Sequence, residues 1–147
     1  MVVSVILARG GSKGIPRKNI VDVNGKPLLY YPIKASLESS VEQTWVSTDD
    51  EEIAKVAHQC GAKVLRRPDS LSTDKSTSES ALIHFAEETE FDHVVFIQPT
   101  SPLLKAKYIN QGLSMIADYD SVFSAYTQHW TPQWTKALPS QPVGWDP

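Results

Sequence analysis

The sequence opens with a buried-strand pattern and a glycine-rich basic loop, and these two segments decide the fold. Residues 2–8 (VVSVILA) form a continuous apolar run rich in β-branched side chains, which is typical of a strand buried on both faces. Residues 9–19 (RGGSKGIPRKN) follow at once and contain three glycines and four basic side chains. Because ligands of parallel sheets bind beyond the carboxyl ends of the strands, this loop is the first candidate for a binding site.

Strand-like and helix-like segments alternate along the rest of the chain. Short β-branched or aromatic runs predict strands, and apolar residues three to four positions apart predict helices. The expected strands are 2–8, 43–47, 62–66, 93–98 and 121–126, and the expected helices are 27–38, 50–60, 79–90 and 105–118. We expect Pro32 to kink the first helix or delay its start, and Thr48 or Asp49 to cap the second. The alternation predicts an α/β fold with three layers (α/β/α) and a mostly parallel sheet.

Composition excludes several classes of protein. The 147 residues predict one domain, and the net charge of −3 argues against a nucleic-acid polymer as partner. Cys60 is the only cysteine, which excludes an intramolecular disulfide framework and a cysteine zinc cluster. The apolar runs are far shorter than the roughly 18 residues of a membrane span, and the N-terminus lacks the pattern of a secretory signal. We therefore expect a cytoplasmic protein with no membrane partner.

Positive charge gathers in the loop after the first strand. The first 21 residues contain four basic side chains and no acidic one, a pattern that suits a small anionic ligand better than a polymer. Glycines expose backbone amides, an arginine can bind two phosphate oxygens, lysines supply mobile charges and a serine adds a hydroxyl. The loop matches neither GxxxxGK[ST] nor GxGxxG, so a solvated basic loop stays open as the alternative. The residues concerned are Arg9, Gly10, Gly11, Ser12, Lys13, Gly14 and Lys18.

Residues 6–20 (ILARGGSKGIPRKNI) resemble the N-terminal signature of the cytidylyltransferases that activate acidic sugars, in particular the N-acylneuraminate (CMP-sialic acid synthetase) type. Other motifs of this family follow in the same order over residues 2–126. They are 24–28 (NGKPL), 46–50 (VSTDD), 66–68 (RRP), 74–80, 98–103 (QPTSPL) and 120–124 (DSVFS). The resemblance implies a Rossmann-like nucleotidyltransferase domain over residues 1–128.

The resemblance also implies a reaction and a set of site residues. CTP and a nine-carbon acidic sugar would give the CMP-sugar and pyrophosphate, with Mg²⁺ as the divalent cation. The implied catalytic residues are Lys18, Arg9 and Asn19. The implied nucleotide-binding residues are Arg9, Gly10, Gly11, Ser12, Lys13, Lys18, Arg67 and Ser80. The implied sugar-binding residues are Gln98, Thr100 and Ser101.

The sequence departs from the family in two places. Leu104 stands where bacterial members often carry arginine, which weakens the prediction for sugar recognition there. The later part of the family, with further basic residues, a dimerisation element and an aspartate pair for the metal, has no counterpart here. We therefore assign no metal ligands, and expect a homodimer only for a full-length relative. Residues 129–147 hold three of the four tryptophans, and we expect them to form a Trp/Pro-rich extension of a truncated chain.

Two hypotheses follow from this pattern. One is an enzyme that activates an N-acylneuraminate or a related sugar acid, such as legionaminic, pseudaminic or ketodeoxy-octulosonic acid. The other is a catalytically inactive CTP-binding fragment or short relative.

Asp49 and Asp50 follow the second expected strand at the same edge of the sheet as the basic loop. We interpret them as helix caps rather than metal ligands.

Overall fold

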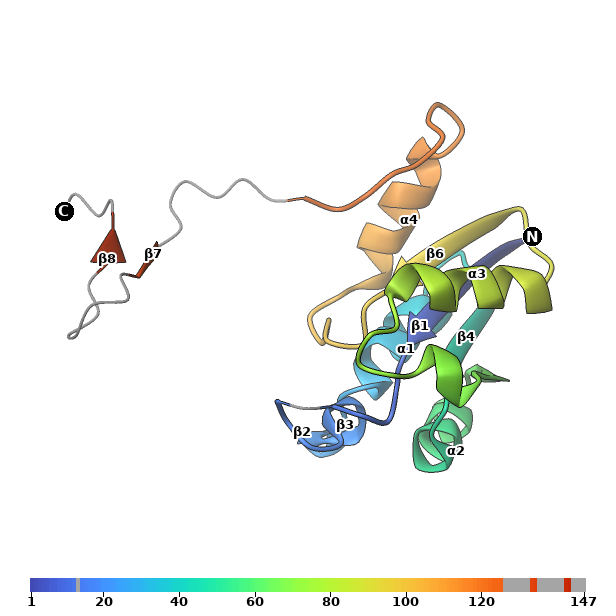
Figure 1. The fold of residues 1–147 in the computed structure, drawn as a ribbon. Coiled ribbons are helices and arrows are strands. Elements are labelled where there is room, and N and C mark those ends of the chain that lie inside the picture. Colours follow the sequence, from blue (N-terminus) through green and yellow to red (C-terminus); the bar gives the residue numbers. More distant parts are fainter. Residues whose placement is uncertain (13, 126–132, 135–141, 144–147) are drawn as a thin grey trace.

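The computed structural model describes residues 1–12, 14–125, 133–134 and 142–143. Four parallel strands form the central sheet in the order β5-β4-β1-β6 (Figure 1). Their bounds are β1 (Val2–Leu7), β4 (Gln43–Thr48), β5 (Lys63–Arg66) and β6 (His93–Ile97). The helices are α1 (Tyr30–Leu37), α2 (Glu51–Gln59), α3 (Ser78–Glu88) and α4 (Ala106–Met115), with short 3-10 turns at η1 (Lys18–Ile20) and η2 (Asp69–Leu71).

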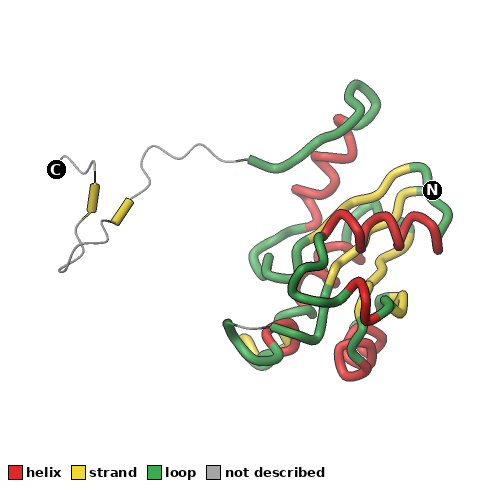
Figure 2. Tube along the Cα trace, in the orientation of Figure 1, coloured by secondary structure: helices red, strands yellow, loops and turns green. Residues whose placement is uncertain are grey.

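Helices cover both faces of the sheet, which confirms the predicted three-layer α/β fold (Figure 2). On one face, Ile6 and Val46 of the sheet pack with Ile33 of α1, Ile53 of α2 and Ile109 of α4, all at most 6% exposed. On the other face, Phe85 of α3 is fully buried on the strands. Fully buried side chains of this kind stabilise the fold by about 1.5–3 kcal/mol each.

The central strand β1 pairs along its length with β4 and β6, in parallel on both sides. Ile6 lies opposite Val46 and Ile97, so all three strands end at nearly the same level. The loops that follow β1, β4 and β6 therefore share one edge of the sheet.

The first helix begins later than the sequence predicts. A small antiparallel hairpin of β2 (Asp22–Val23) and β3 (Lys26–Pro27) occupies the chain before it. Asn24 and Gly25 form its turn with φ angles of 53° and 79°, a conformation typical of tight hairpins. With α1 starting at Tyr30, Pro32 falls in the first turn, where a proline is tolerated.

The fifth strand expected at 121–126 is wrong over residues 121–125, which have no regular structure; residue 126 lies outside the described residues. Among the described residues β6 is the edge strand and pairs only with β1, so residues 121–125 do not pair with its open edge. Phe123 is 86% exposed, and Val122 lies against Gly112 of α4 instead of the sheet. In the extension, two short segments pair in antiparallel fashion, namely β7 (Gln133–Trp134) and β8 (Pro142–Val143).

Two phenylalanines provide a matched test of this fold. We expect Phe85→Ala to lower the free energy of unfolding by about 3–5 kcal/mol, because it leaves a cavity under α3. Phe123→Ala should change it by less than about 0.5 kcal/mol, since the ring is exposed. Urea unfolding measures both values. A comparable loss in the two variants would contradict the description of residues 121–125.

Candidate functional site

The basic loop closes on itself at the carboxyl end of β1. Asn19, which is 4% exposed, donates a hydrogen bond from Nδ2 to the carbonyl oxygen of Arg9 at 3.0 Å. This bond joins the start of the loop to the turn η1 that ends it. The amide of Gly10 donates to Asp49 Oδ1 at 3.0 Å, which fixes the loop to the end of β4. The loop is therefore anchored before any ligand binds.

Asp50 caps α2, which confirms its interpretation as a helix cap, whereas Thr48 and Asp49 do not cap this helix. Its Oδ1 accepts hydrogen bonds from the amides of Glu52 and Ile53, both at 2.9 Å. Thr48 Oγ1 accepts from the amide of Asp50 at 3.1 Å, and Asp49 turns toward Gly10. Both neighbours thus have other partners, and the helix begins one residue later than the sequence predicts.

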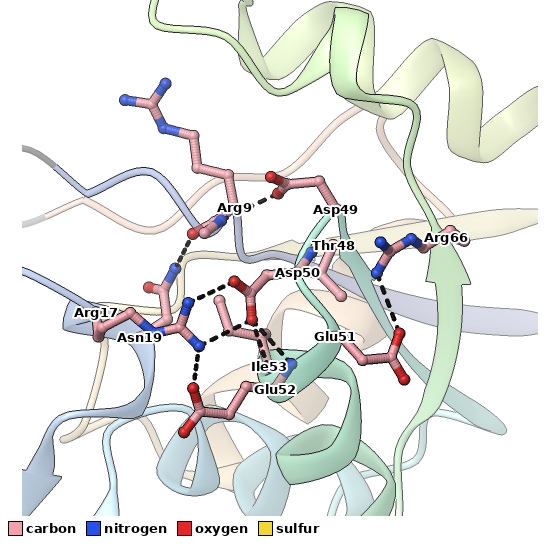
Figure 3. A network of polar contacts seen from close by, with 11 residues as sticks. Arg9, Arg17, Asn19, Thr48, Asp49, Asp50, Glu51, Glu52, Ile53 and Arg66 are labelled. Atoms are coloured by element: carbon pink, nitrogen blue, oxygen red, sulfur yellow. Dashed lines mark hydrogen bonds and ion pairs between the residues drawn. The ribbon is translucent and has the colours of Figure 1, made fainter.

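Arg17 binds this cap (Figure 3). Its Nη1 donates to Asp50 Oδ2 at 2.5 Å, its Nη2 donates to Asp50 Oδ1 at 3.0 Å, and the guanidinium also pairs with Glu52. The hydrogen bond with Asp50 raises the pKa of Arg17. Burial raises the pKa of the Asp50 carboxyl, but hydrogen bonds from Arg17 and from the α2 amides lower it to below its ordinary value.

Two other arginines flank the loop. Arg9 Nη1 donates to the carbonyl oxygen of Thr73 at 2.7 Å and lies 3.3 Å from Asp74 Oδ1, so it reaches the segment after β5. Arg67 is 5% exposed and donates from Nη2 to the carbonyl oxygen of Ser47 at 3.2 Å. Burial lowers the pKa of Arg67, Asp49 opposes this shift and Arg9 adds to it. A bound anion would relieve both the burial cost and the repulsion between the two guanidinium groups.

The remaining loop residues offer groups to a ligand. Lys18 is half-buried in η1 and has no ion-pair partner among the residues that the structure describes. Around Gly11, a Cβ would meet no atom within 4 Å, so its backbone faces open space. Ser12 is half-buried, and its amide donates to the carbonyl oxygen of Gly10 at 3.0 Å. Lys13 lies outside the described residues.

Three buried polar atoms near the loop have no hydrogen-bond partner in the described part of the chain. They are Asn19 Oδ1, Ser47 Oγ and Arg67 Nε. Ser47 lies in β4 and Arg67 follows β5, so they surround the carboxyl edge from which the loop leaves. An unsatisfied buried polar group costs free energy, and such groups at a binding site are satisfied by ligand or water.

The other predicted site residues lie on neighbouring segments. Ser80 is in the first turn of α3, where its hydroxyl donates to the carbonyl oxygen of Thr77 at 2.9 Å. Gln98, Thr100 and Ser101 follow β6, whose carboxyl end lies beside that of β1. The shared edge brings these residues to the side of the sheet that holds the loop, but no hydrogen bond joins them to it within the described ranges. The structure leaves their predicted roles untested.

Arg17 and Asp49 anchor the loop, a role that was not predicted for either residue from the sequence. A signal was available, because an acidic pair follows β4 at the same sheet edge where a basic loop follows β1. Opposite charges on one edge predict contact between the two loops.

This combination of fold and loop defines an α/β domain of the nucleotidyltransferase kind, with a basic, glycine-rich loop after its central strand. The cytidylyltransferase family model matches residues 3–141, and the chain therefore belongs to the cytidylyltransferase family.

Similar proteins act on acidic sugars. N-acylneuraminate cytidylyltransferase A of Danio rerio is 46% identical over 130 residues, which cover 86% of this chain and 30% of that protein. A pseudaminic acid cytidylyltransferase of Campylobacter jejuni is 40% identical over 126 residues, 81% of this chain and 54% of that protein. A CMP:2-keto-3-deoxy-manno-octonic acid synthetase complexed with CTP has a TM-score of 0.71 at 26% identity, covering 80% and 48% of the two chains. The chain thus spans only part of these relatives.

The described residues hold no group of three or more histidine, cysteine or acidic side chains placed to bind a metal ion. Asp49 Oδ1 accepts from the Gly10 amide and Asp50 pairs with Arg17, so both carboxylates already have protein partners. A protein of the same fold, Rv0371c of Mycobacterium tuberculosis, has been solved with manganese (TM-score 0.57, 11% identity).

No helix in the described part of the chain is long and apolar enough to cross a membrane.

The two loop glycines give a matched prediction. A Cβ on Gly10 would lie 2.8 Å from Asp50 Oδ2 and 3.0 Å from Asp50 Cβ. Gly10→Ala must therefore displace the loop or the cap, and should lower the free energy of unfolding by about 1–3 kcal/mol. Gly11→Ala, with open space around it, should be neutral or slightly stabilising. Equal stability of the two variants in urea would argue against the anchored loop.

The pairing of Arg17 with Asp50 should depend on pH. Asp50→Asn keeps a good helix cap but removes the charge that binds Arg17. Because the folded-state pKa of Asp50 is lowered from 3.8, its stabilising effect is complete above that value and is lost as the pH falls through the folded-state pKa. Wild type should therefore exceed Asp50→Asn in stability at neutral pH and approach it in acid. A difference that stays constant down to pH 2 would contradict the assignment.

Proposed function

We propose that the chain is the nucleotide-binding part of an enzyme that transfers CMP from CTP to the anomeric hydroxyl of a nine-carbon acidic sugar of the N-acylneuraminate type. The observation that carries the proposal is the anchored loop, which gathers Arg9, Lys18 and open backbone at the carboxyl end of β1. Three basic side chains of the loop, Arg9, Lys13 and Lys18, suit a triphosphate better than a single phosphate. Identity of 46% to an N-acylneuraminate cytidylyltransferase supports the choice of substrate.

The chemistry asks the protein mainly for position and positive charge. The anomeric oxygen of the sugar attacks the α-phosphorus and forms a new P–O bond. The bond from that phosphorus to the bridging oxygen breaks, and pyrophosphate leaves with the electron pair. The hydroxyl proton passes to solvent. We assign Lys18 to the charge that develops on the α-phosphoryl group and the leaving pyrophosphate, because it is half-buried and unpaired among the described residues.

The other assignments follow the surroundings of each side chain. Arg9 and Ser12 would bind the triphosphate from the loop, with Lys13 beside them. Asn19 would keep the loop closed through its bond to the Arg9 carbonyl. Arg67 would reach the nucleotide with its unpaired Nε, together with Ser80.

The sugar acid would lie over the end of β6. Gln98, Thr100 and Ser101 are the residues that we assign to it, because the parallel register brings this segment beside β1. Mg²⁺ would be bound by the phosphates of CTP, since the described residues supply no set of ligands.

Removal of the Lys18 charge tests the proposed reaction. In pyrophosphate release with CTP, Mg²⁺ and a panel of acidic sugars, Lys18→Ala should lower the rate by about 10²–10³-fold. Lys55→Ala is the matched control, because Lys55 is an exposed lysine on α2. The assay is run on this chain and on one extended at its C-terminus.

The outcomes separate the candidate functions. Turnover with an N-acylneuraminate that depends on Lys18 supports the proposal. Preference for another sugar acid would show that the substrate differs from the one proposed, while the reaction stays the same. Turnover that is unchanged in Lys18→Ala overturns the role of this residue. CTP binding without pyrophosphate release in either chain would favour the catalytically inactive CTP-binding protein, which the coverage of only 30% of its relative keeps open.

A further inference from the structure

Two adjacent carboxylates hold the two ends of the basic loop. Asp49 accepts from the Gly10 amide at the start of the loop, at 3.0 Å. Asp50 binds the guanidinium of Arg17 at its end with two hydrogen bonds of 2.5 and 3.0 Å (Figure 3). The side chain of Asp50 is only 18% exposed, so water screens this pair less than an open surface pair.

The backbone of Arg17 is also unusual. It has φ 55° and ψ 30°, the left-handed conformation that glycine adopts most easily. Arg17 is the N-cap of η1, and its carbonyl oxygen accepts from the amide of Ile20 at 2.9 Å. The backbone conformation of Arg17 therefore sets the orientation of η1, which contains Lys18 and Asn19. A strained backbone of this kind persists only where surrounding contacts hold it.

We propose that Arg17 is a positioning residue for Lys18. By binding Asp50, it fixes η1 against the start of α2 and so directs the lysine to the phosphates of the nucleotide. The inference rests on the proposed function, because it assigns Lys18 to those phosphates. It separates Arg17 from the other three cations of the loop, since both of its terminal nitrogens already bind carboxylates of α2 and its cap.

Two variants separate positioning from direct phosphate contact. Arg17→Gly allows the left-handed backbone without steric strain but removes the ion pair. Asp50→Asn keeps Arg17 and the helix cap but weakens the interaction between Arg17 and residue 50. A phosphate contact predicts that Asp50→Asn leaves CTP affinity unchanged or improves it, because Arg17 is freed. Positioning predicts weaker CTP binding in both variants. Arg66→Ala is the matched control, because Arg66 pairs with Glu51 of the same helix at 3.6 Å and is exposed.

The experiment measures CTP affinity by calorimetry and amide hydrogen exchange in the ligand-free chain. Arg17→Gly should weaken CTP binding by about tenfold in the wild-type background and not at all in Lys18→Ala, because it acts through that lysine. Exchange at residues 18–20 should be faster in Arg17→Gly and Asp50→Asn, and unchanged in Arg66→Ala.

The inference is overturned if the effects of Arg17→Gly and Lys18→Ala add independently, or if exchange in η1 does not change. Its failure differs from failure of the proposed function. Absence of CTP binding to the wild-type chain contradicts the proposed function, and with it the assignment of Lys18 to the phosphates. The exchange measurement then still decides whether Arg17 and Asp50 fix the turn, since it needs no nucleotide.

Discussion

The parallel pairing of β1 between β4 and β6 is the constraint on which the rest of the structure depends. It brings the ends of three strands to one level, so the basic loop, the acidic pair and the segment after β6 meet at one edge. The same pairing buries Val3, Val5 and Ile6 on the two faces of the sheet. The register of β1 thus determines both the core and the site. A shift of β1 by one residue would turn its buried apolar side chains to the opposite faces of the sheet and displace the basic loop.

The carboxylates at this edge hold the loop without filling its open side. Asp49 and Asp50, at the start of α2, bind Gly10 and Arg17. Asn19 closes the loop through its hydrogen bond to the Arg9 carbonyl oxygen. By contrast, the space around Gly11 is open and Lys18 has no ion-pair partner among the described residues. An anion that binds there meets groups that are already positioned. Preorganised charge of this kind is what phosphoryl-type transfer requires from a protein.

The strands of the sheet and the position of the basic loop could largely be predicted from the sequence, because both depend on local residue patterns. The runs 2–8 and 43–47 carry enough β-branched and apolar residues to define strands, and the loop chemistry is visible in 9–19. Residues 121–126 have the same strand-like composition, yet 121–125 are not a strand, because composition does not determine whether a segment pairs with a sheet edge. For Arg17, the opposite charges at one sheet edge could predict contact between the two loops, but not which cation pairs with Asp50, 33 residues away in the chain.

Calorimetric titration of the chain with CTP and with CMP tests the central claim most directly. If the loop after β1 binds the triphosphate, CTP should bind much more tightly than CMP, because only CTP places two further phosphates among the basic side chains and free amides. Equal affinity for the two nucleotides, or none for either, would show that the loop does not bind the triphosphate.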